Sequence, residues 1–170
     1  MHTTNNHNGQ LTNQVGIHAF WESRLPELFS TNYNFIVGKA NYIENPLKEA
    51  WKIIKHTHNL VDTVLIFESQ LSTSFPSDKK YSFSERNNTV LKQYSTAYSK
   101  AYHDKMEDMV EKQMRSAILE IGSFWFSAWV DAGQPELTNL IKIDLDPEEK
   151  KMENDAETKY QKGIPIGREL

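Results

Sequence analysis

The stretch GIHAFWE places a histidine and a glutamate, His18 and Glu22, four residues apart. Side chains at this spacing lie on one side of a helix, so an imidazole nitrogen and a carboxylate oxygen can bind the same cation. A further histidine, His2, stands in the polar segment that precedes this stretch. If that segment folds back, the three side chains form a His₂Glu set, which catalytic zinc sites use while leaving one position open for water. The plainer alternative is a surface hydrogen bond or ion pair, because a His-x-x-x-Glu spacing also arises by chance.

The composition indicates one folded domain without a broad basic surface. The chain has 170 residues, 38% of them hydrophobic and 11% aromatic, which is enough to bury a core. A net charge of −4, with both signs interspersed, argues against a stable complex with nucleic acid. Because the chain contains no cysteine, any metal must be held by His, Asp or Glu.

Helices must position these candidate ligands. Residues 3–16 are rich in Asn, Thr, Gln and Gly and predict a loop, after which the apolar spacing predicts a helix over residues 17–28, kinked or restarted at Pro26. A second, long helix is expected from Asn45, as N-cap, to about Leu71.

The rest of the chain predicts one more long helix and a tail. Residues 73–88 carry Pro76 and several serines and predict a connecting loop, and a helix is expected from about Asn88 to Asp131, where Gly133 supplies a stop. No segment shows the alternation that a sheet needs, so we expect an all-α protein, a helical bundle of long antiparallel helices. Residues 138–170 are charged and poor in large apolar side chains, and we expect this tail to be disordered.

The chain shows no signal for export or membrane insertion. Its first residues lack a charged region followed by an apolar one, and no apolar stretch reaches the length of a membrane span.

The order of the motifs resembles a known family. HTTNNHNGQLTNQVGIHAFWESRLPELF followed by VGKANYIENPLKEAWKIIKHTHNLVDTVL is similar to the C-terminal half of bacterial members of the zinc-dependent phospholipase C and single-strand nuclease superfamily. The resemblance continues through FPSDKKYSFSERNNTVLKQYSTAYSKAYHDKM and RSAILEIGSFWFSAWVDAGQPEL and covers residues 1–137, which we expect to form the C-terminal part of such a domain. It implies a nearly all-helical fold, a cluster of three zinc ions and hydrolysis of phosphoester bonds by metal-activated water.

The resemblance also implies roles for individual residues. His2 matches the histidine of the family's Pro-Leu-His turn, and His18 and Glu22 match its later His-x-x-x-Asp/Glu pair; in relatives these three residues ligate one zinc. The ligands of the other two zincs would precede Met1, so the chain resembles a fragment, or a gene product started at an internal methionine. We therefore expect at most one zinc and no phosphodiesterase activity from the chain alone. The resemblance leaves the catalytic and substrate-binding residues unassigned and does not distinguish nucleic acid from phospholipid as the substrate.

The alternative to a phosphoesterase fragment is a non-enzymatic helical interaction module or a decayed remnant. Such a chain would expose the apolar face that the missing half once covered and would self-associate through it. Relatives of this superfamily are typically exported, but the sequence assigns no localisation to this chain.

Other histidines and aromatic residues have plainer interpretations. His56 and His58 lie two residues apart, which on a helix directs them to different faces. His7 is a loop residue between His2 and His18 that can approach the cleft in which the family binds zinc. His103 is expected on a solvated helix face. Phe124, Trp125, Phe126 and Trp129 could stack on bases, but at helical spacing a core role is the better prediction.

Overall fold

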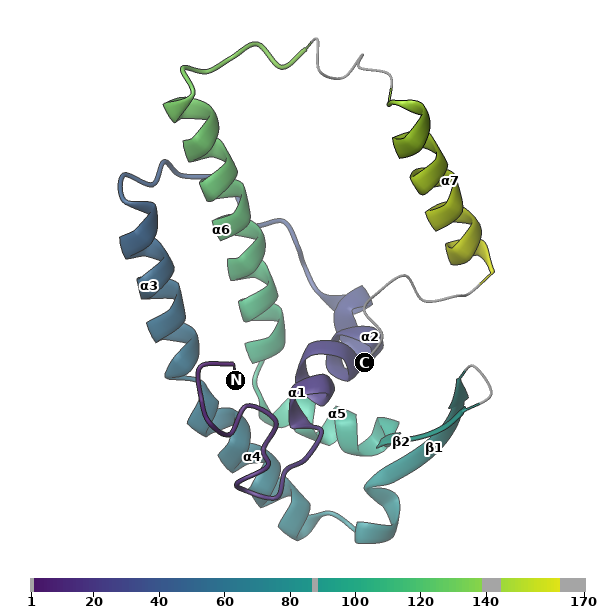
Figure 1. Cartoon of the computed structure of the whole chain (residues 1–170). Helices are drawn as coiled ribbons and strands as arrows, with labels where there is room; N and C mark the ends of the chain where they lie inside the picture. The colour runs from purple at the N-terminus through teal and green to yellow at the C-terminus, as the bar shows by residue number, and fades with distance from the viewer. Residues whose placement is uncertain (1, 87–88, 139–144, 163–170) are drawn as a thin grey trace. The chain divides into compact units, whose positions relative to one another are not determined.

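The computed structural model describes residues 2–86, 89–138 and 145–162, and the chain divides into two compact units, Met1–Asp131 and Ala132–Leu170 (Figure 1). The first unit contains most of the helices, one two-stranded sheet and the candidate ligands.

The first helix changes its winding along its length. It consists of α1 (Ile17–Ala19), the π-helical segment η1 (Phe20–Arg24), α2 (Leu25–Phe29) and a 3₁₀ turn, η2 (Ser30–Asn32). Pro26 has no N–H for the carbonyl of Glu22, and in an α-helix its ring would clash with that carbonyl. A wider turn, in which the Leu25 N–H donates to the Phe20 carbonyl, avoids this clash. The predicted helix over residues 17–28 and its irregularity near Pro26 are confirmed.

Two helices replace the single long helix predicted from Asn45. Helix α3 (Pro46–His58) begins as expected, with the Asn45 side chain accepting a hydrogen bond from the Lys48 N–H, but it ends at Asn59 and α4 (Val61–Ser74) follows. The break falls where Thr57, whose hydroxyl donates back to the Ile53 carbonyl, is followed by the weak helix formers His58 and Asn59.

A β-hairpin forms where a loop and the start of a helix were predicted. After the short 3₁₀ turn η3 (Ser77–Lys79), β1 (Tyr81–Arg86) pairs antiparallel with β2 (Thr89–Tyr94), and Tyr81 lies opposite Tyr94. The prediction was wrong because Tyr and Phe alternate with Ser in YSFS and a β-branched pair opens TVLKQY, which favours strands. The all-α expectation is corrected accordingly: the fold is mostly helical, with one small sheet.

Helix α5 (Thr96–Lys105) and helix α6 (Met109–Asp131) occupy the rest of the predicted helix 88–131. Left-handed backbone at Glu107 and Asp108, with φ of 48° and 63°, separates them. The predicted stop is confirmed, since α6 ends at Asp131 and Gly133 adopts a φ of 82°.

The core of the first unit is built around aromatic rings. Phe20 stacks on Tyr94 and Tyr102 with ring centroids 4.0 and 5.2 Å apart, and Tyr98 is stacked on Tyr94. The buried hydroxyl of Tyr102 donates to the Val64 carbonyl at 2.7 Å. The first helix, α4, β2 and α5 therefore share one core, and the first helix contributes Phe20 to it.

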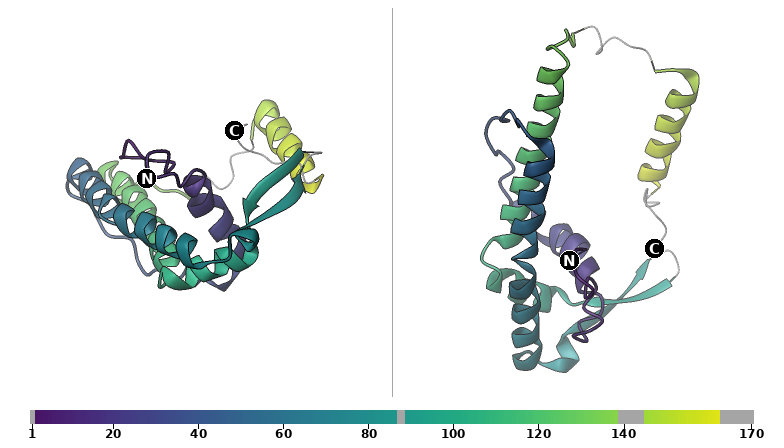
Figure 2. Two further views of the ribbon diagram at one scale, coloured as in Figure 1. Left: turned by 90° about the horizontal axis from the view of Figure 1, so that it is seen from below. Right: turned by 60° about the vertical axis from the view of Figure 1, so that its left-hand side comes forward.

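The extended segment that contains Asn41 and Ile43 is hydrogen bonded to α6. The N–H groups of Asn41 and Ile43 donate to the hydroxyls of Ser123 and Ser127, which are buried on α6. Because these serines occupy the inner side of α6, the aromatic residue between them turns outward: Trp125 is 75% exposed. The predicted core role of Trp125 was wrong. Helix α3 runs alongside α6 (Figures 1 and 2), and residues of both helices line a groove between them.

The second unit contains helix α7 (Pro147–Gln161), which lies inside the segment 138–170 for which the sequence predicts disorder. Glu and Lys form helices readily but supply little apolar surface to bury, so the same composition favours both a helix and the absence of a core. Residues 139–144 and 163–170 of that segment lie outside the described residues. Over the described residues no helix combines the length and apolar character needed to cross a membrane.

Candidate metal centre

His18 and Glu22 meet on one side of the first helix. His18 belongs to α1 and Glu22 to η1, and the His18 Nε2 lies 2.8 Å from the Glu22 Oε1. The left-handed Gly16, with a φ of 88°, precedes α1 and lets the preceding loop turn back along the helix. The widened η1 turn therefore sets the position of the carboxylate relative to the imidazole, and π-helical turns of this kind are frequent at functional sites.

The loop brings His2 to the same carboxylate. Its Nε2 lies 3.1 Å from the Glu22 Oε1, and the His2 and His18 rings contact edge to face with centroids 4.3 Å apart. The candidate ligand atoms of all three residues lie within 4.8 Å of one another. No other group of three or more His, Cys, Asp or Glu residues in the described part of the chain comes as close together.

Hydrogen bonds fix the loop that carries His2. The Thr3 hydroxyl is bonded to the His58 Nδ1 at 2.9 Å, which ties the residue next to His2 to the end of α3. At the other end of the loop, the Asn8 side chain accepts from the Gly16 N–H at 3.1 Å. The loop that carries His2 is thus tied at one end to α3 and closed at the other end just before α1.

The buried carboxylate of Glu68 anchors the loop near its C-terminal end. Gln14 donates through its Nε2 to the Glu68 Oε2 and to the Leu65 carbonyl, each at 2.7 Å. Gly9 adopts a φ of 70°, and a Cβ there would lie 2.5 Å from the Gln14 carbonyl oxygen, so only glycine fits this close approach. The loop predicted over residues 3–16 is therefore an ordered, core-anchored loop.

The donor set fits a zinc ion. Zinc with nitrogen and oxygen ligands at about 2.0–2.1 Å in a tetrahedron requires donor atoms about 3.3 Å apart. The two Nε2–Oε1 separations, 2.8 and 3.1 Å, are close to that value, and all three ligand atoms lie within 4.8 Å of one another. A zinc dication bound by two neutral imidazoles and one carboxylate forms a complex with a net charge of +1, as in His₂Glu sites. His18 is 24% exposed, Glu22 49% and His2 69%, so water can reach the remaining coordination position.

A small apolar cavity adjoins the candidate ligands. It has a volume of about 240 Å³ and is lined by Trp21, Val61, Val64 and, at its edge, Glu22. The Trp21 indole N–H is buried and has no hydrogen-bond partner within the described structure. The predicted packing role of Trp21 agrees with its contacts to the core.

Of the remaining histidines, His58 supports the loop through Thr3 and His7 lies beside His18. The His7 and His18 rings are 6.0 Å apart between centroids, whereas His56 lines the groove between α3 and α6. His103 is not on a solvated face as predicted: its Nε2 is hydrogen bonded to the Tyr33 hydroxyl at 2.6 Å, and burial lowers its pKa. Burial, together with Glu111 and Asp108, raises the pKa of Tyr33 to about 12.

Sequence reasoning missed the residues that position the loop. Thr3, His58, Gln14 and Glu68 make contacts between residues 51 to 55 positions apart, which no local pattern indicates. One available signal was Glu68 itself, a charged residue four positions after Val64 on the buried side of α4.

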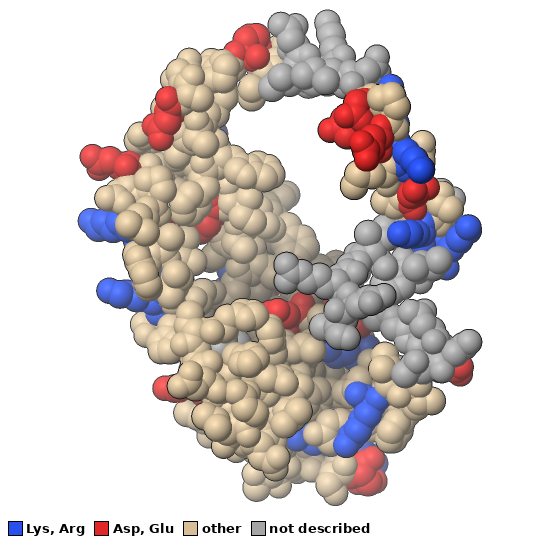
Figure 3. Space-filling view, viewed as in Figure 1, with Lys and Arg blue, Asp and Glu red and all other residues tan. Residues whose placement is uncertain are grey.

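The comparisons with known proteins place the chain in no family: no family model, no curated protein and no solved structure matches it. On the face shown in Figure 3, Lys and Arg side chains do not merge into one broad basic patch.

Proposed function

We propose that this chain binds one zinc ion through His2, His18 and Glu22 and contributes it to the hydrolysis of phosphoester bonds. The observation that carries the zinc site is the convergence of three donor atoms within 4.8 Å from a helix and a separately anchored loop. Zinc with three protein ligands activates water for attack at phosphorus. The phosphoester class rests on the resemblance to the phospholipase C and nuclease superfamily, and with it we propose that residues 1–137 form the C-terminal part of that helical fold.

This chain's own residues would hold and orient the ion. His18 and Glu22 come from a helix packed into the core, so their positions change little, while His2 closes the site from the loop. A site of three zinc ions needs more donors than the one group of three present in the described residues. We therefore propose that the isolated chain has no phosphodiesterase activity.

Zinc titration of the purified chain tests the site. We expect binding of one zinc per chain, and His18→Ala should weaken it by more than about 100-fold, since it removes a direct ligand. His56→Ala, at a histidine of α3 that is not one of the three candidate ligands, is the matched control and should bind as the wild type does. Equal zinc binding by wild type and His18→Ala would refute the assignment.

A phosphodiesterase assay tests the proposed inactivity of the isolated chain. With bis-(p-nitrophenyl) phosphate and saturating zinc, we expect no hydrolysis above the buffer rate. Zinc-dependent turnover that is lost in His18→Ala would contradict the proposed inactivity and show that one zinc suffices.

A second candidate function, an interaction module that pairs with a second copy, is favoured by the outward face of α6. Ile118, Ile121 and Trp125 follow one another at the three- and four-residue spacing of a coiled-coil seam and are 41%, 52% and 75% exposed. A second copy would present the same stripe and cover this one. In light scattering, we expect a concentration-dependent dimer that Ile121→Lys combined with Trp125→Lys abolishes. Met152→Lys, at an exposed apolar residue of α7, is the control, and a monomer at all concentrations would contradict this candidate.

A further inference from the structure

Helix α3 carries a row of apolar side chains at the surface of the first unit. Leu47, Trp51 and Ile54 are 71%, 55% and 37% exposed. They follow one another at intervals of four and three residues, which places them on one side of the helix. None of the 13 residues of α3 is buried. The helix therefore presents an apolar stripe, Leu47–Trp51–Ile54, and an exposed apolar row of this kind marks an interaction surface.

The apolar stripe faces away from the neighbouring helix α6. Glu49, Ile53 and His56 line the groove between α3 and α6. Since successive helical residues are rotated by about 100°, these three residues lie on the opposite side of α3 from the stripe. Helix α3 lies at the edge of the first unit, next to α6 (Figures 1 and 2). The stripe is thus a convex ridge and does not belong to that groove.

Lysines lie beside the apolar stripe. Lys48 and Lys55 are exposed and lie within about 100° of the stripe around the helix axis. Neither forms an ion pair with a residue that the structure describes, whereas Lys52 is paired with Glu49 at 2.7 Å. With three lysines and one glutamate, α3 is basic in a chain whose net charge is −4. Lys and Arg side chains project at the left of Figure 3, where α3 lies.

This combination of side chains matches the surface of an anionic membrane. A helix lying on a bilayer places its apolar side among the lipid headgroups, while lysines beside that side reach the negative charges. Tryptophan is favoured at this depth because its ring is apolar and its N–H is polar. A second copy of the chain would bring the same lysines to the contact, where like charges repel. A lipid surface supplies both an apolar layer and negative charge.

We propose that α3 binds the surface of an anionic lipid bilayer. The stripe Leu47–Trp51–Ile54 enters the headgroup region, and the ammonium groups of Lys48 and Lys55 contact the negatively charged headgroups. The contact is peripheral, with the helix lying in the plane of the surface. This inference goes beyond the proposed zinc site and does not depend on phosphoester hydrolysis.

Co-sedimentation of the whole chain with lipid vesicles tests the proposal. We expect binding to phosphatidylcholine vesicles that contain about 30% phosphatidylserine, and much weaker binding to phosphatidylcholine alone. Trp51→Ser should weaken the binding at least about tenfold, because it removes the largest apolar side chain of the stripe. Phe83→Ser, at a 72% exposed aromatic residue of β1, is the control and should bind as the wild type does. No binding to the anionic vesicles, or equal losses in the two variants, would overturn the proposal.

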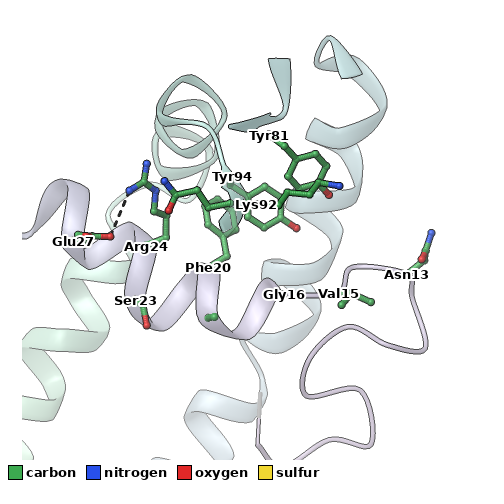
Figure 4. A pocket seen from close by; sticks show the side chains of 12 residues that line it. Asn13, Val15, Gly16, Phe20, Ser23, Arg24, Glu27, Tyr81, Lys92 and Tyr94 are labelled. Carbon is green, nitrogen blue, oxygen red and sulfur yellow. Dashed lines mark hydrogen bonds and ion pairs between the residues drawn. The ribbon is translucent and has the colours of Figure 1, made fainter. Parts of the chain in front are cut away.

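Paired lysine substitutions test the role of charge. Lys48→Gln combined with Lys55→Gln should weaken binding to the anionic vesicles at least about tenfold, and the difference should shrink as the salt concentration rises. Lys79→Gln combined with Lys92→Gln makes the same charge change next to and on the hairpin, where Lys92 lies beside the Tyr81 ring (Figure 4), and should have little effect. Equal losses in the two double variants would show that net charge, and not α3, governs the binding.

Fluorescence quenching by lipids with brominated acyl chains locates the inserted side chain. Trp51→Phe keeps an aromatic ring in the stripe, so it should still sediment with the vesicles but lose the quenching, whereas Trp125→Phe should be quenched as the wild type is. Quenching that persists in Trp51→Phe would place the contact elsewhere. A dimer in lipid-free solution that Trp51→Ser abolishes would assign the stripe to a second copy and refute the membrane proposal. His18→Ala should bind the vesicles as tightly as the wild type, which keeps this test separate from the zinc proposal.

Discussion

Thr3 and His58 show how a single hydrogen bond can position a metal ligand without touching the metal. The Thr3 hydroxyl, 2.9 Å from the His58 Nδ1, fixes the loop backbone one residue after His2. His2 is the most exposed of the three candidate ligands, with 69% of its side chain accessible, and so depends most on its neighbours for orientation. In known metal sites, neighbouring hydrogen bonds orient the side chains that bind the metal.

We expect Thr3→Val to lower zinc affinity about tenfold while all three donor groups remain. His58→Ala should lower it by the same factor, and the double variant no further, because both substitutions remove one shared contact. Thr73→Val, at an exposed threonine of α4, is the control. Isothermal titration with zinc measures the effect, and additive losses in the double variant would show that the two residues act separately.

Among the individual residues, the sequence predicted the three candidate ligands but not the residues that hold the loop in place. His18 and Glu22 are separated by one helical turn, so their proximity follows from helix formation alone. The contact of His2 with Glu22 depends on the loop path, which the resemblance implied and the residues alone did not determine. Whether the group binds zinc stays a prediction.

At the scale of the elements, Pro26 couples the shape of the first helix to the candidate site. The π-helical turn Phe20–Arg24 contains Glu22 and ends directly before the turn that holds Pro26. An α-helical winding of the same residues would rotate Glu22 relative to His18.

We expect Pro26→Ala to stabilise the chain by about 1–2 kcal/mol, because an N–H becomes available to the Glu22 carbonyl and the helix no longer needs the wide turn that keeps the proline ring away from it. The same substitution should weaken zinc binding, since the wide turn is no longer favoured. Urea unfolding and zinc titration of one preparation measure both quantities, with Ala19→Gly as a control that destabilises the helix without altering Pro26. An unchanged zinc affinity would show that the π-helical turn has no role in the site.

The elements also show where local patterns fail. The hairpin Tyr81–Tyr94 was predicted as loop and helix although YSFS and TVLKQY favour strands locally, and the hairpin brings Tyr94 onto Phe20. Trp125 was predicted to be buried because apolar residues at helical spacing usually are, yet the buried side of α6 carries serines that bind an extended segment. At Trp125 a long-range contact overrides the local preference, whereas in the hairpin the local preference and the structure agree.

At the scale of the whole first unit, Glu68 is the buried group on which separate parts of the chain converge. Its carboxylate accepts hydrogen bonds from Gln14 of the loop, Tyr98 of α5 and Lys80 next to the hairpin, at 2.7, 2.8 and 3.0 Å. Burial alone would raise the pKa of Glu68, but these bonds and one from Ser72 favour the ionised form and hold the pKa below its ordinary value of 4.5.

The lowered pKa gives the stability of this unit a defined pH dependence. A carboxylate whose pKa is lower in the folded than in the unfolded chain stabilises the fold fully above the unfolded value, and this contribution is lost as the pH falls below 4.5 and through the folded pKa. We expect Glu68→Gln to lower the free energy of unfolding by about 2–3 kcal/mol at pH 7, because Lys80 loses its anionic partner. The loss should shrink as the pH falls through the lowered pKa of the wild-type carboxyl, where it takes up its proton.

Urea unfolding at several pH values, followed by tryptophan fluorescence, measures this difference. Glu85→Gln, at an exposed glutamate of β1, carries the same change in charge and should leave the stability at pH 7 within about 0.5 kcal/mol of the wild type. Because Glu68 also anchors Gln14, Glu68→Gln should loosen the loop and weaken zinc binding at pH 7, whereas Glu85→Gln should not. A Glu68→Gln chain with wild-type stability at pH 7 would mean that the loop, α5 and the hairpin are held together by apolar packing alone.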